Sequence, residues 1–444
     1  MGKNQEIIKS DDQFMPQANR IKYFDMVIKS GSGAILTDVE GKKYIDLLAS
    51  ASSTNIGHSH PAVVKAISEQ AANLTHYTTA YYGNEPSSNL LKRLSGLAPG
   101  DFDKKVALGN SGSDANDALI KFARAFTGRQ TIVSFAGSYH GSTYGSLSLS
   151  GVSHNMSRKI GPLLPGTVKL PFPDVHKKFP DESAETFVHR TWAEFMDAFE
   201  NWLPADEVAC VLIEPIQGDG GIVPVPYEFM QKLYQFCQEN GILFAVDEIN
   251  QGLGRSGKMW AIEHFDIAPD LMTIGKSLAS GLPLSALIGR SEIMDSLDSP
   301  AHAFTTAGNP VCAAAAHATL DVILQENLPE RSQKLGQIAQ RFFENEQKKH
   351  DFIGSVRMIG LNGGIDIVKS DGSPDSEATV KIIARLFELG VIMITLRSNI
   401  LRFQPPLVIS ENELQAAFDK LSQTFDELEN GKLDLPTGNS KIGW

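Results

Sequence analysis

Short apolar runs alternate with amphipathic helical patterns through the middle of the chain. The runs lack the strict apolar–polar alternation of a half-exposed strand, and each is followed by a stretch with helical spacing of its apolar residues. Buried strands separated by helices predict a mostly parallel sheet that is covered on both faces. The apolar runs are KVALG (105–109), TIVSFAG (131–137), VACVLIEPI (208–216), ILFAVDEI (242–249), LMTIG (271–275) and SALIGR (285–290).

The two ends of the chain have a different pattern. The first 30 residues are polar and predict an arm, and residues 33–50 alternate around Glu40-Gly41 as in a β-hairpin. A proline followed by helical spacing predicts a helix over 61–74. Long helical patterns and a few strands follow the sheet region. We expect an α/β fold with three parts: 1–57, an arm and hairpin that pack with the small domain; 58–318, the large domain; 319–444, a smaller α+β domain.

Composition excludes several classes of protein. The 444 residues contain 42% hydrophobic residues, which is ordinary for a globular protein. Lys and Arg number 40 against 52 Asp and Glu, a net charge of −12, which argues against nucleic-acid binding. Three widely spaced cysteines suggest a reducing compartment. The N-terminus lacks the apolar core of a secretory signal, and no apolar run approaches the roughly 20 residues of a membrane span. We expect a cytoplasmic enzyme without a membrane partner.

Ligands of such sheets bind beyond the carboxyl ends of the strands. GNSGSDAN (109–116) follows a predicted strand and precedes a helix, which suits a phosphate at the helix N-terminus. The alternative is a plain strand-to-helix turn capped by Ser113. Asp247-Glu248 with Gly275-Lys276-Ser277 could suggest a nucleotide hydrolase. However, Asp270 stands where a P-loop requires glycine, and the order of the motifs is reversed.

A lysine at the edge of the sheet can instead form a Schiff base. Pyridoxal 5′-phosphate (PLP) needs such a lysine, a phosphate cradle, an acid for its pyridine nitrogen and an aromatic ring to stack on. Residues at four of the predicted strand ends could supply these groups: Lys276, Ser111-Gly112-Ser113, Asp247 and Tyr139, respectively.

These residues amount to a family resemblance over essentially the full chain. The chain resembles the class III aminotransferases, PLP-dependent enzymes of fold type I, and within them the amino-acid racemases. The resemblance implies a large mostly parallel sheet domain, a smaller α+β domain, PLP as cofactor, and at least a homodimer, with a tetramer as an alternative. The motifs that carry it are NSGSDAN (110–116), YHG (139–141), IEPIQGDGG (213–221), VDEINQGLGRSGK (246–258), IGKSLASGLPLSA (274–286), FTTAGNP (304–310) and LRFQPPLVI (401–409).

The resemblance also implies roles for individual residues. Lys276 corresponds to the lysine that binds the cofactor covalently, and Asp247 to the partner of the pyridine nitrogen. Thr305 corresponds to a threonine that reaches the phosphate of the neighbouring subunit, with Thr306 as a second choice. The remaining correspondences are Gly112 and Ser113 with the phosphate, Tyr139 with the ring, and Arg402 with the substrate α-carboxylate. Asn250 stands where the family commonly has glutamine, so its contact with the ring is an open expectation.

A single aspartate separates two possible reactions. A transaminase returns the proton to the cofactor, whereas a racemase returns it to Cα from the opposite face, which is simplest with a second acid/base. Family transaminases commonly have glutamate at the position of Asp219, and the racemases that the chain resembles share the aspartate. We expect Lys276 and Asp219 to be the catalytic pair of a racemase of apolar amino acids such as isoleucine, valine and leucine. A class III aminotransferase is the alternative, and a loop aspartate that caps a Gly-Gly turn is the structural explanation of Asp219.

Other conspicuous residues have plainer explanations. His58 and His60 are typical of a turn before a helix, and we expect no metal site. His140 could be a general base, although packing beside the cofactor explains it better. Tyr77, Tyr81 and Tyr82 could wall a pocket or pack in a core.

Overall fold

The computed structural model describes residues 2–179 and 181–436. The chain divides into two compact units, a smaller one of Met1–Pro61, Arg255–Gly257 and Glu326–Trp444 and a larger one of Ala62–Gly254 and Lys258–Gln325. The expected boundary at 318/319 lies inside α10 (Pro310–Gln325), all of which belongs to the larger unit. The three-part domain division stays a prediction.

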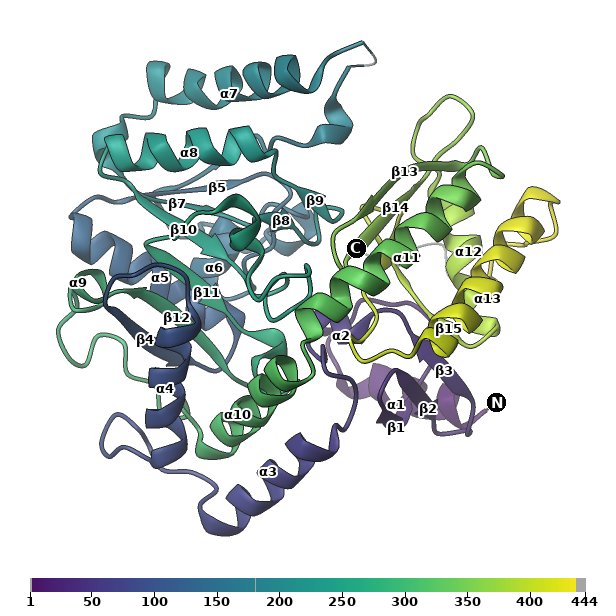
Figure 1. The fold of residues 1–444 in the computed structure, drawn as a ribbon, viewed down its shortest axis with the longest axis horizontal. Coiled ribbons are helices and arrows are strands. Elements are labelled where there is room, and N and C mark those ends of the chain that lie inside the picture. The colour runs from purple at the N-terminus through teal and green to yellow at the C-terminus, as the bar shows by residue number, and fades with distance from the viewer. Residues whose placement is uncertain (1, 180, 437–444) are drawn as a thin grey trace. The chain divides into compact units, whose positions relative to one another are not determined.

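The larger unit contains a seven-stranded sheet of order β4-β12-β11-β10-β7-β5-β6 (Figure 1). Neighbours from β11 to β6 run parallel, and β12 is antiparallel to both β11 and β4. The prediction of a mostly parallel sheet is confirmed, although β6 was not predicted. The strands are β4 (Lys104–Gly109), β5 (Thr131–Phe135), β6 (Thr167–Leu170), β7 (Val208–Ile213), β10 (Leu243–Asp247), β11 (Leu271–Ile274) and β12 (Ser285–Arg290), with a separate pair β8 (Ile216–Gln217) and β9 (Val223–Pro224).

Helices cover both faces of this sheet. Leu243 and Ala245 of β10 belong to one buried cluster with Leu119 of α5, whereas Phe244 packs against Tyr234 of α8. Successive side chains of a strand point to opposite faces, so α5 and α8 lie on opposite faces. Figure 1 shows α7 stacked on α8. The helices are α3 (Pro61–Asn73), α4 (Glu85–Leu97), α5 (Gly112–Thr127), α6 (Tyr144–Leu149), α7 (Ala184–Asn201), α8 (Tyr227–Glu239), α9 (Ser291–Met294) and α10.

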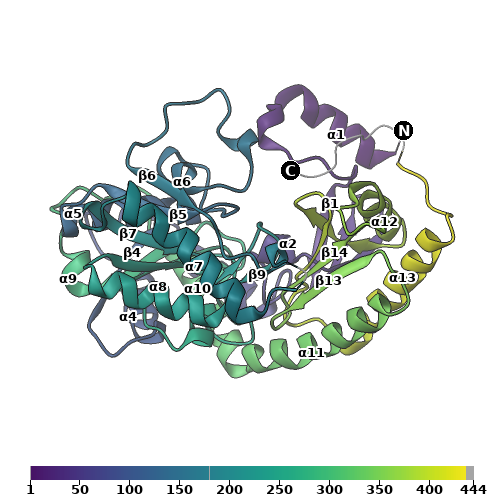
Figure 2. The same ribbon diagram turned by 90° about the horizontal axis from the view of Figure 1, so that it is seen from above.

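The smaller unit contains two four-stranded sheets, β1-β2-β3-β15 and β13-β14-β17-β16, with helices packed beside the second (Figure 2). The predicted hairpin is confirmed, since β2 pairs antiparallel with β3 and Thr37 lies opposite Lys43. The polar first 30 residues include a helix. The elements are α1 (Lys3–Phe14), β1 (Ile28–Ser32), β2 (Ile35–Asp38), β3 (Lys43–Asp46), α2 (Ala49–Ser52), α11 (Leu328–Gln347), β13 (Ile353–Met358), β14 (Gly363–Ile367), α12 (Ser376–Glu388), β15 (Val391–Ile392), β16 (Ile394–Leu396), β17 (Ile400–Phe403) and α13 (Glu411–Glu429).

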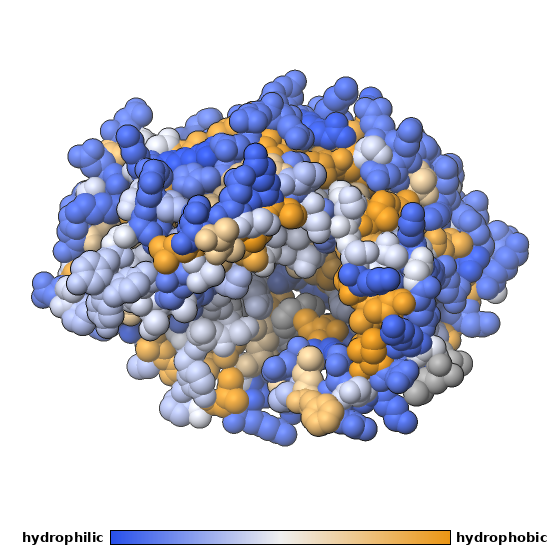
Figure 3. All heavy atoms as spheres, turned by 90° about the horizontal axis from the view of Figure 1, so that it is seen from below, coloured by the Kyte–Doolittle hydropathy of each residue, from blue (hydrophilic) through white to orange (hydrophobic). Residues whose placement is uncertain are grey.

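The surface carries the polar residues that the composition predicts. Hydrophilic side chains cover much of the face in Figure 3, with hydrophobic residues scattered among them. Among the described residues, no helix combines the length and the apolar character needed to cross a bilayer.

Candidate active site

The predicted phosphate cradle lies between β4 and α5. Ser111, not Ser113, caps the helix: its hydroxyl accepts from the N–H of Asp114 at 3.3 Å, within a reciprocal capping box. Ser113 instead accepts from the N–H of Ser142 at 3.0 Å. A Cβ at Gly112 would lie 2.8 Å from Cδ1 of Ile249, so only glycine lets these segments approach so closely. The first turn of α5 therefore presents backbone N–H groups and the positive end of the helix dipole.

Asp247 ends β10 and is 3% exposed. Its Oδ1 accepts from the N–H of Ile249 at 3.0 Å, and its Oδ2 accepts from Nδ2 of Asn116 at 3.0 Å. His140 Nδ1 lies 2.8 Å from the same Oδ2, and His140 Nε2 is buried without a hydrogen-bond partner among the described residues. These neighbours stabilise the ionised carboxylate, since a buried charge is tolerated only where donors satisfy it.

Lys276 follows β11 directly after Gly275 and begins a 3-10 turn. Its φ of 44° lies in the left-handed region, which non-glycine residues rarely adopt. A Cβ at Gly275 would lie 3.5 Å from Cα of Gly112, so the lysine turn lies against the start of α5. The strained backbone of Lys276 is typical of functional sites.

A single cavity of about 200 Å³ in the larger unit unites most of the predicted residues. It brings together the cradle, Tyr139, Asp219, Asp247, Asn250 and Lys276. Its lining residues are Ser111, Gly112, Ser113, Tyr139, His140, Gly141, Glu214, Gly218, Asp219, Asp247, Ile249, Asn250 and Lys276. Residues from five different segments that follow strands of the sheet therefore line one cavity, as expected for ligand sites at the carboxyl ends of strands.

Two predicted residues do not line this cavity. Thr305 is exposed on the loop before α10, and the neighbouring Thr306 donates to Oδ1 of Asn110 at 3.1 Å within the same chain. Arg402 lies on β17 of the smaller unit, where it is 2% exposed and its Nε donates to Oε1 of Gln404 at 2.6 Å. The roles of both residues stay predictions.

Sequence reasoning missed Glu214, whereas it expected His140 to pack beside the cofactor, with a general base as the alternative. Both residues line the cavity, and the pKa of Glu214 is raised to about 7, chiefly because burial disfavours its charged form. The available signal was a carboxylate directly after the apolar strand β7 and before a proline. Like Asp247, an acidic residue at a strand end is a candidate for the ligand cavity.

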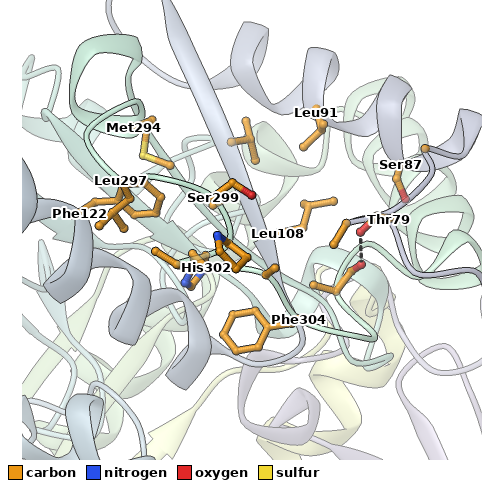
Figure 4. A pocket seen from close by; sticks show the side chains of 18 of the residues that line it. Thr79, Ser87, Leu91, Leu108, Phe122, Met294, Leu297, Ser299, His302 and Phe304 are labelled. Carbon is orange, nitrogen blue, oxygen red and sulfur yellow. Dashed lines mark hydrogen bonds between the residues drawn. The ribbon is translucent and has the colours of Figure 1, made fainter.

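A second, larger cavity of about 470 Å³ lies between residues 79–91, β4 and residues 294–307 (Figure 4). No lysine or arginine is among its described lining residues, and Thr79 donates to the carbonyl of Ala307 at 2.8 Å. Burial lowers the pKa of His302 there to about 4, which keeps the ring neutral. Although Asp298 lines it, this cavity offers no lysine among its described lining residues for a Schiff base with the cofactor.

Residues 16–425 match the family described as Aminotransferase class-III. The chain belongs to the class III aminotransferase family. It is 57% identical to isoleucine 2-epimerase of Lentilactobacillus buchneri, over 100% of this chain and 99% of that protein. It is 40% identical to leucine/methionine racemase of Thermococcus litoralis, over 100% of both chains. The solved omega transaminase of Pseudomonas jessenii in complex with PMP has a TM-score of 0.88 at 26% identity, with 96% of this chain and 99% of that chain covered.

The chain is an enzyme of fold type I, and its cofactor is PLP. The cavity has the donor set that PLP requires. Asp247 offers a buried carboxylate for the pyridine nitrogen, Lys276 an amine for the aldehyde, and the start of α5 N–H groups for the phosphate. A Cβ at Gly112 would lie against the side chain of Ile249, which also lines the cavity.

Proposed function

We propose that the chain is a PLP-dependent racemase and 2-epimerase of apolar amino acids, converting isoleucine to allo-isoleucine and also acting on valine and leucine. The observation that carries the proposal is that Asp219 and Lys276 line the same buried cavity as Asp247. The epimerase and racemase names of the two relatives support the same reaction class.

The roles of the residues follow from their chemistry. PLP, when bound, supplies an electron sink for the electron pair left when Cα loses its proton. Asp247 keeps the pyridine nitrogen protonated, and Tyr139 packs on the ring. Lys276 exchanges the Cα proton on one face. Arg402 binds the α-carboxylate through its planar guanidinium, which suits a bidentate carboxylate contact.

Asp219 is the acid/base on the opposite face. It lies in the turn between β8 and β9 and is 8% exposed, so bulk water does not compete freely at its carboxylate. One amine cannot readily serve both faces of a planar carbon, and a second positioned group provides inversion. Asn250 also lines the cavity, where it would be available to contact the cofactor ring.

Two further properties accompany this proposal. A homodimer is the minimal assembly, because Thr305 is exposed and is outside the cavity of its own chain, as expected of a residue that serves a neighbouring subunit. Three buried free cysteines support a reducing, cytoplasmic location.

The decisive experiment uses the purified holoenzyme with L-isoleucine in deuterated buffer and no keto acid. We expect allo-isoleucine, because inversion at Cα leaves Cβ untouched and gives a diastereomer. Asp219→Asn should slow this inversion by ~10²–10⁴-fold, the usual cost of removing a positioned acid/base. Deuterium uptake with retention should persist for the stereoisomer whose proton faces Lys276.

NMR of Cα and chiral chromatography measure the two rates separately. Near-wild-type inversion in Asp219→Asn would refute the two-base assignment. Keto-acid-dependent amino transfer in place of inversion would establish the aminotransferase alternative. If Asp219 only shaped the turn and transferred no proton, Asp219→Asn would reduce exchange and inversion together.

A further inference from the structure

Glu214 joins two cavity loops that are far apart in sequence. It follows β7, is 5% exposed and lines the cavity. Its Oε1 accepts from the N–H of Tyr139 at 3.1 Å, and its Oε2 accepts from the N–H of Gly218 at 2.7 Å. One buried carboxylate therefore binds the loop that carries the ring-stacking residue and the turn that carries Asp219.

Gly218 anchors that turn from both sides. While its N–H donates to Glu214, its carbonyl accepts from the N–H groups of Gly221 and Ile222, each at 3.0 Å. A Cβ at Gly218 would lie 3.1 Å from Nε2 of Gln251 and 3.3 Å from Oε2 of Glu214, so the contact has little spare room. Asp219 is the next residue, and the position of its backbone depends on this anchor.

The ionised form of Glu214 holds both loops more strongly than the protonated form does. A carboxylate has acceptor sites on both oxygens, whereas the protonated group carries a hydrogen on one of them. Burial raises the pKa of Glu214 to about 7, His140 offsets part of that rise, and Asp247 adds to it. Hydrogen bonds to a charged acceptor are stronger than neutral ones, so each N–H bond restrains its loop firmly.

We infer that Glu214 is a positioning residue that holds the Asp219 turn and the Tyr139 loop in place across the cavity. Glu214 does not transfer the proton. Its bond to Gly218 keeps Asp219 on the face opposite Lys276, so Glu214 governs inversion more than exchange. The inference rests on the proposed two-base function.

The test is the ratio of inversion to Cα deuterium exchange in holoenzyme variants at saturating PLP. Glu214→Gln replaces one acceptor oxygen with an NH₂ group, which cannot accept from a backbone N–H. We expect inversion to fall by about 10- to 100-fold, the factor for losing one hydrogen bond to a charged group. Exchange on the Lys276 face should fall far less, so the ratio drops.

Glu248 provides a matched control. It is 2% exposed, its pKa is also raised by burial, and it accepts from the N–H groups of Ala261 and Ile262. It is outside the lining of the cavity. Glu248→Gln should therefore keep the wild-type ratio, even where it lowers stability as much as Glu214→Gln.

A second variant reaches the same contact from the other side. Gly218→Ala places a methyl group against both Gln251 and Glu214 without changing any charge, and by displacing the turn it should lower the ratio in the same direction. If Glu214→Gln does not fold, the ratio measured for Gly218→Ala tests the positioning role instead. An unchanged ratio in these variants, whether inversion and exchange fall equally or not at all, would overturn the inference.

The double variant Asp219→Asn/Glu214→Gln separates this inference from the proposed function. If Glu214 acts through Asp219, the double variant should invert no more slowly than Asp219→Asn alone. If Asp219→Asn impairs inversion while Glu214→Gln leaves the ratio unchanged, only the positioning role fails. If Asp219→Asn inverts normally, the two-base function and this inference both fail.

Discussion

A group of buried acidic side chains in the larger unit and a pair of buried arginines in the smaller unit respond to burial in opposite ways. The strand ends of the larger unit bury the carboxylates of Glu214, Asp247 and Glu248, which accept from backbone N–H groups. The smaller unit buries the guanidinium groups of Arg255 and Arg402. Arg255 donates to the carbonyls of Leu361 and Pro405 and to the side chains of Ser52 and Asn55.

The comparison shows that neutral groups satisfy these charges in both units. Their effect on acidity is nevertheless opposite in sign, because burial always disfavours the charged form. It raises the pKa of Glu248 to about 8 and lowers the pKa of Arg255 to about 9. In each unit, one buried charge supports the backbone and another is assigned to a ligand. Substituting a backbone-supporting residue and a proposed ligand-binding residue of the same unit can therefore separate effects on stability from effects on the reaction.

Lys276→Ala should have the largest effect on the reaction. It removes the amine that we propose binds the cofactor and exchanges the Cα proton, so racemisation should fall by at least ~10⁴-fold, the upper end for a positioned acid/base. Borohydride reduction followed by peptide mapping should find pyridoxyl-lysine at Lys276 in the wild type. A modified peptide containing another lysine would contradict the assignment.

Arg402→Lys sharpens the contrast between the two buried guanidinium groups. A lysine lacks the planar fork that binds a carboxylate at two points, so KM for isoleucine should rise by about 10- to 100-fold, with a smaller change in kcat. Steady-state kinetics measure both constants. Arg255→Lys is the matched control, in which stability should fall while KM stays near the wild-type value. Equal changes of KM in both variants would argue against a specific carboxylate contact at Arg402.

Glu248→Gln should have the smallest effect and concerns stability. The folded pKa of Glu248 is about 8, against 4.5 for an ordinary glutamate, so the folded state binds more protons between these values. The free energy of unfolding must then decrease as pH rises from about 4.5 to about 8. Urea unfolding between pH 5 and pH 8.5 should show a shallower decrease in Glu248→Gln than in the wild type. The exposed Glu69→Gln should keep the wild-type slope.

Asp247 and Glu248 show how much of the site the local sequence pattern can predict. Both end one apolar run, and their alternation predicts that they point in opposite directions. Nothing in the run says which direction holds a cavity. The fold places Asp247 beside His140 and Asn116 in the cavity and Glu248 against the backbone of residues 261 and 262. Two adjacent carboxylates thereby acquire different functions.

The N-terminal cap of α5 is another feature that the local sequence pattern did not predict correctly. Ser111 and Ser113 are both suitable capping residues, and the choice between them depends on where the helix begins. Asp114 decides it by bonding back to the N–H groups of Asn110 and Ser111. Strand β6 was missed because TVKL contains only two apolar residues among four and pairs through its backbone with β5.

The sequence by itself determined the order of the sheet-forming runs, the hairpin, the family and the identities of Lys276, Asp247 and Asp219, because these depend on local spacing and residue chemistry. Only the tertiary structure decided that Glu214 belongs to the cavity and that it holds two loops. Tyr139 and Gly218 reach Glu214 through backbone N–H groups, which every residue except proline carries. Contacts made by such groups leave no residue-type signal in the sequence, and folding alone brings them together.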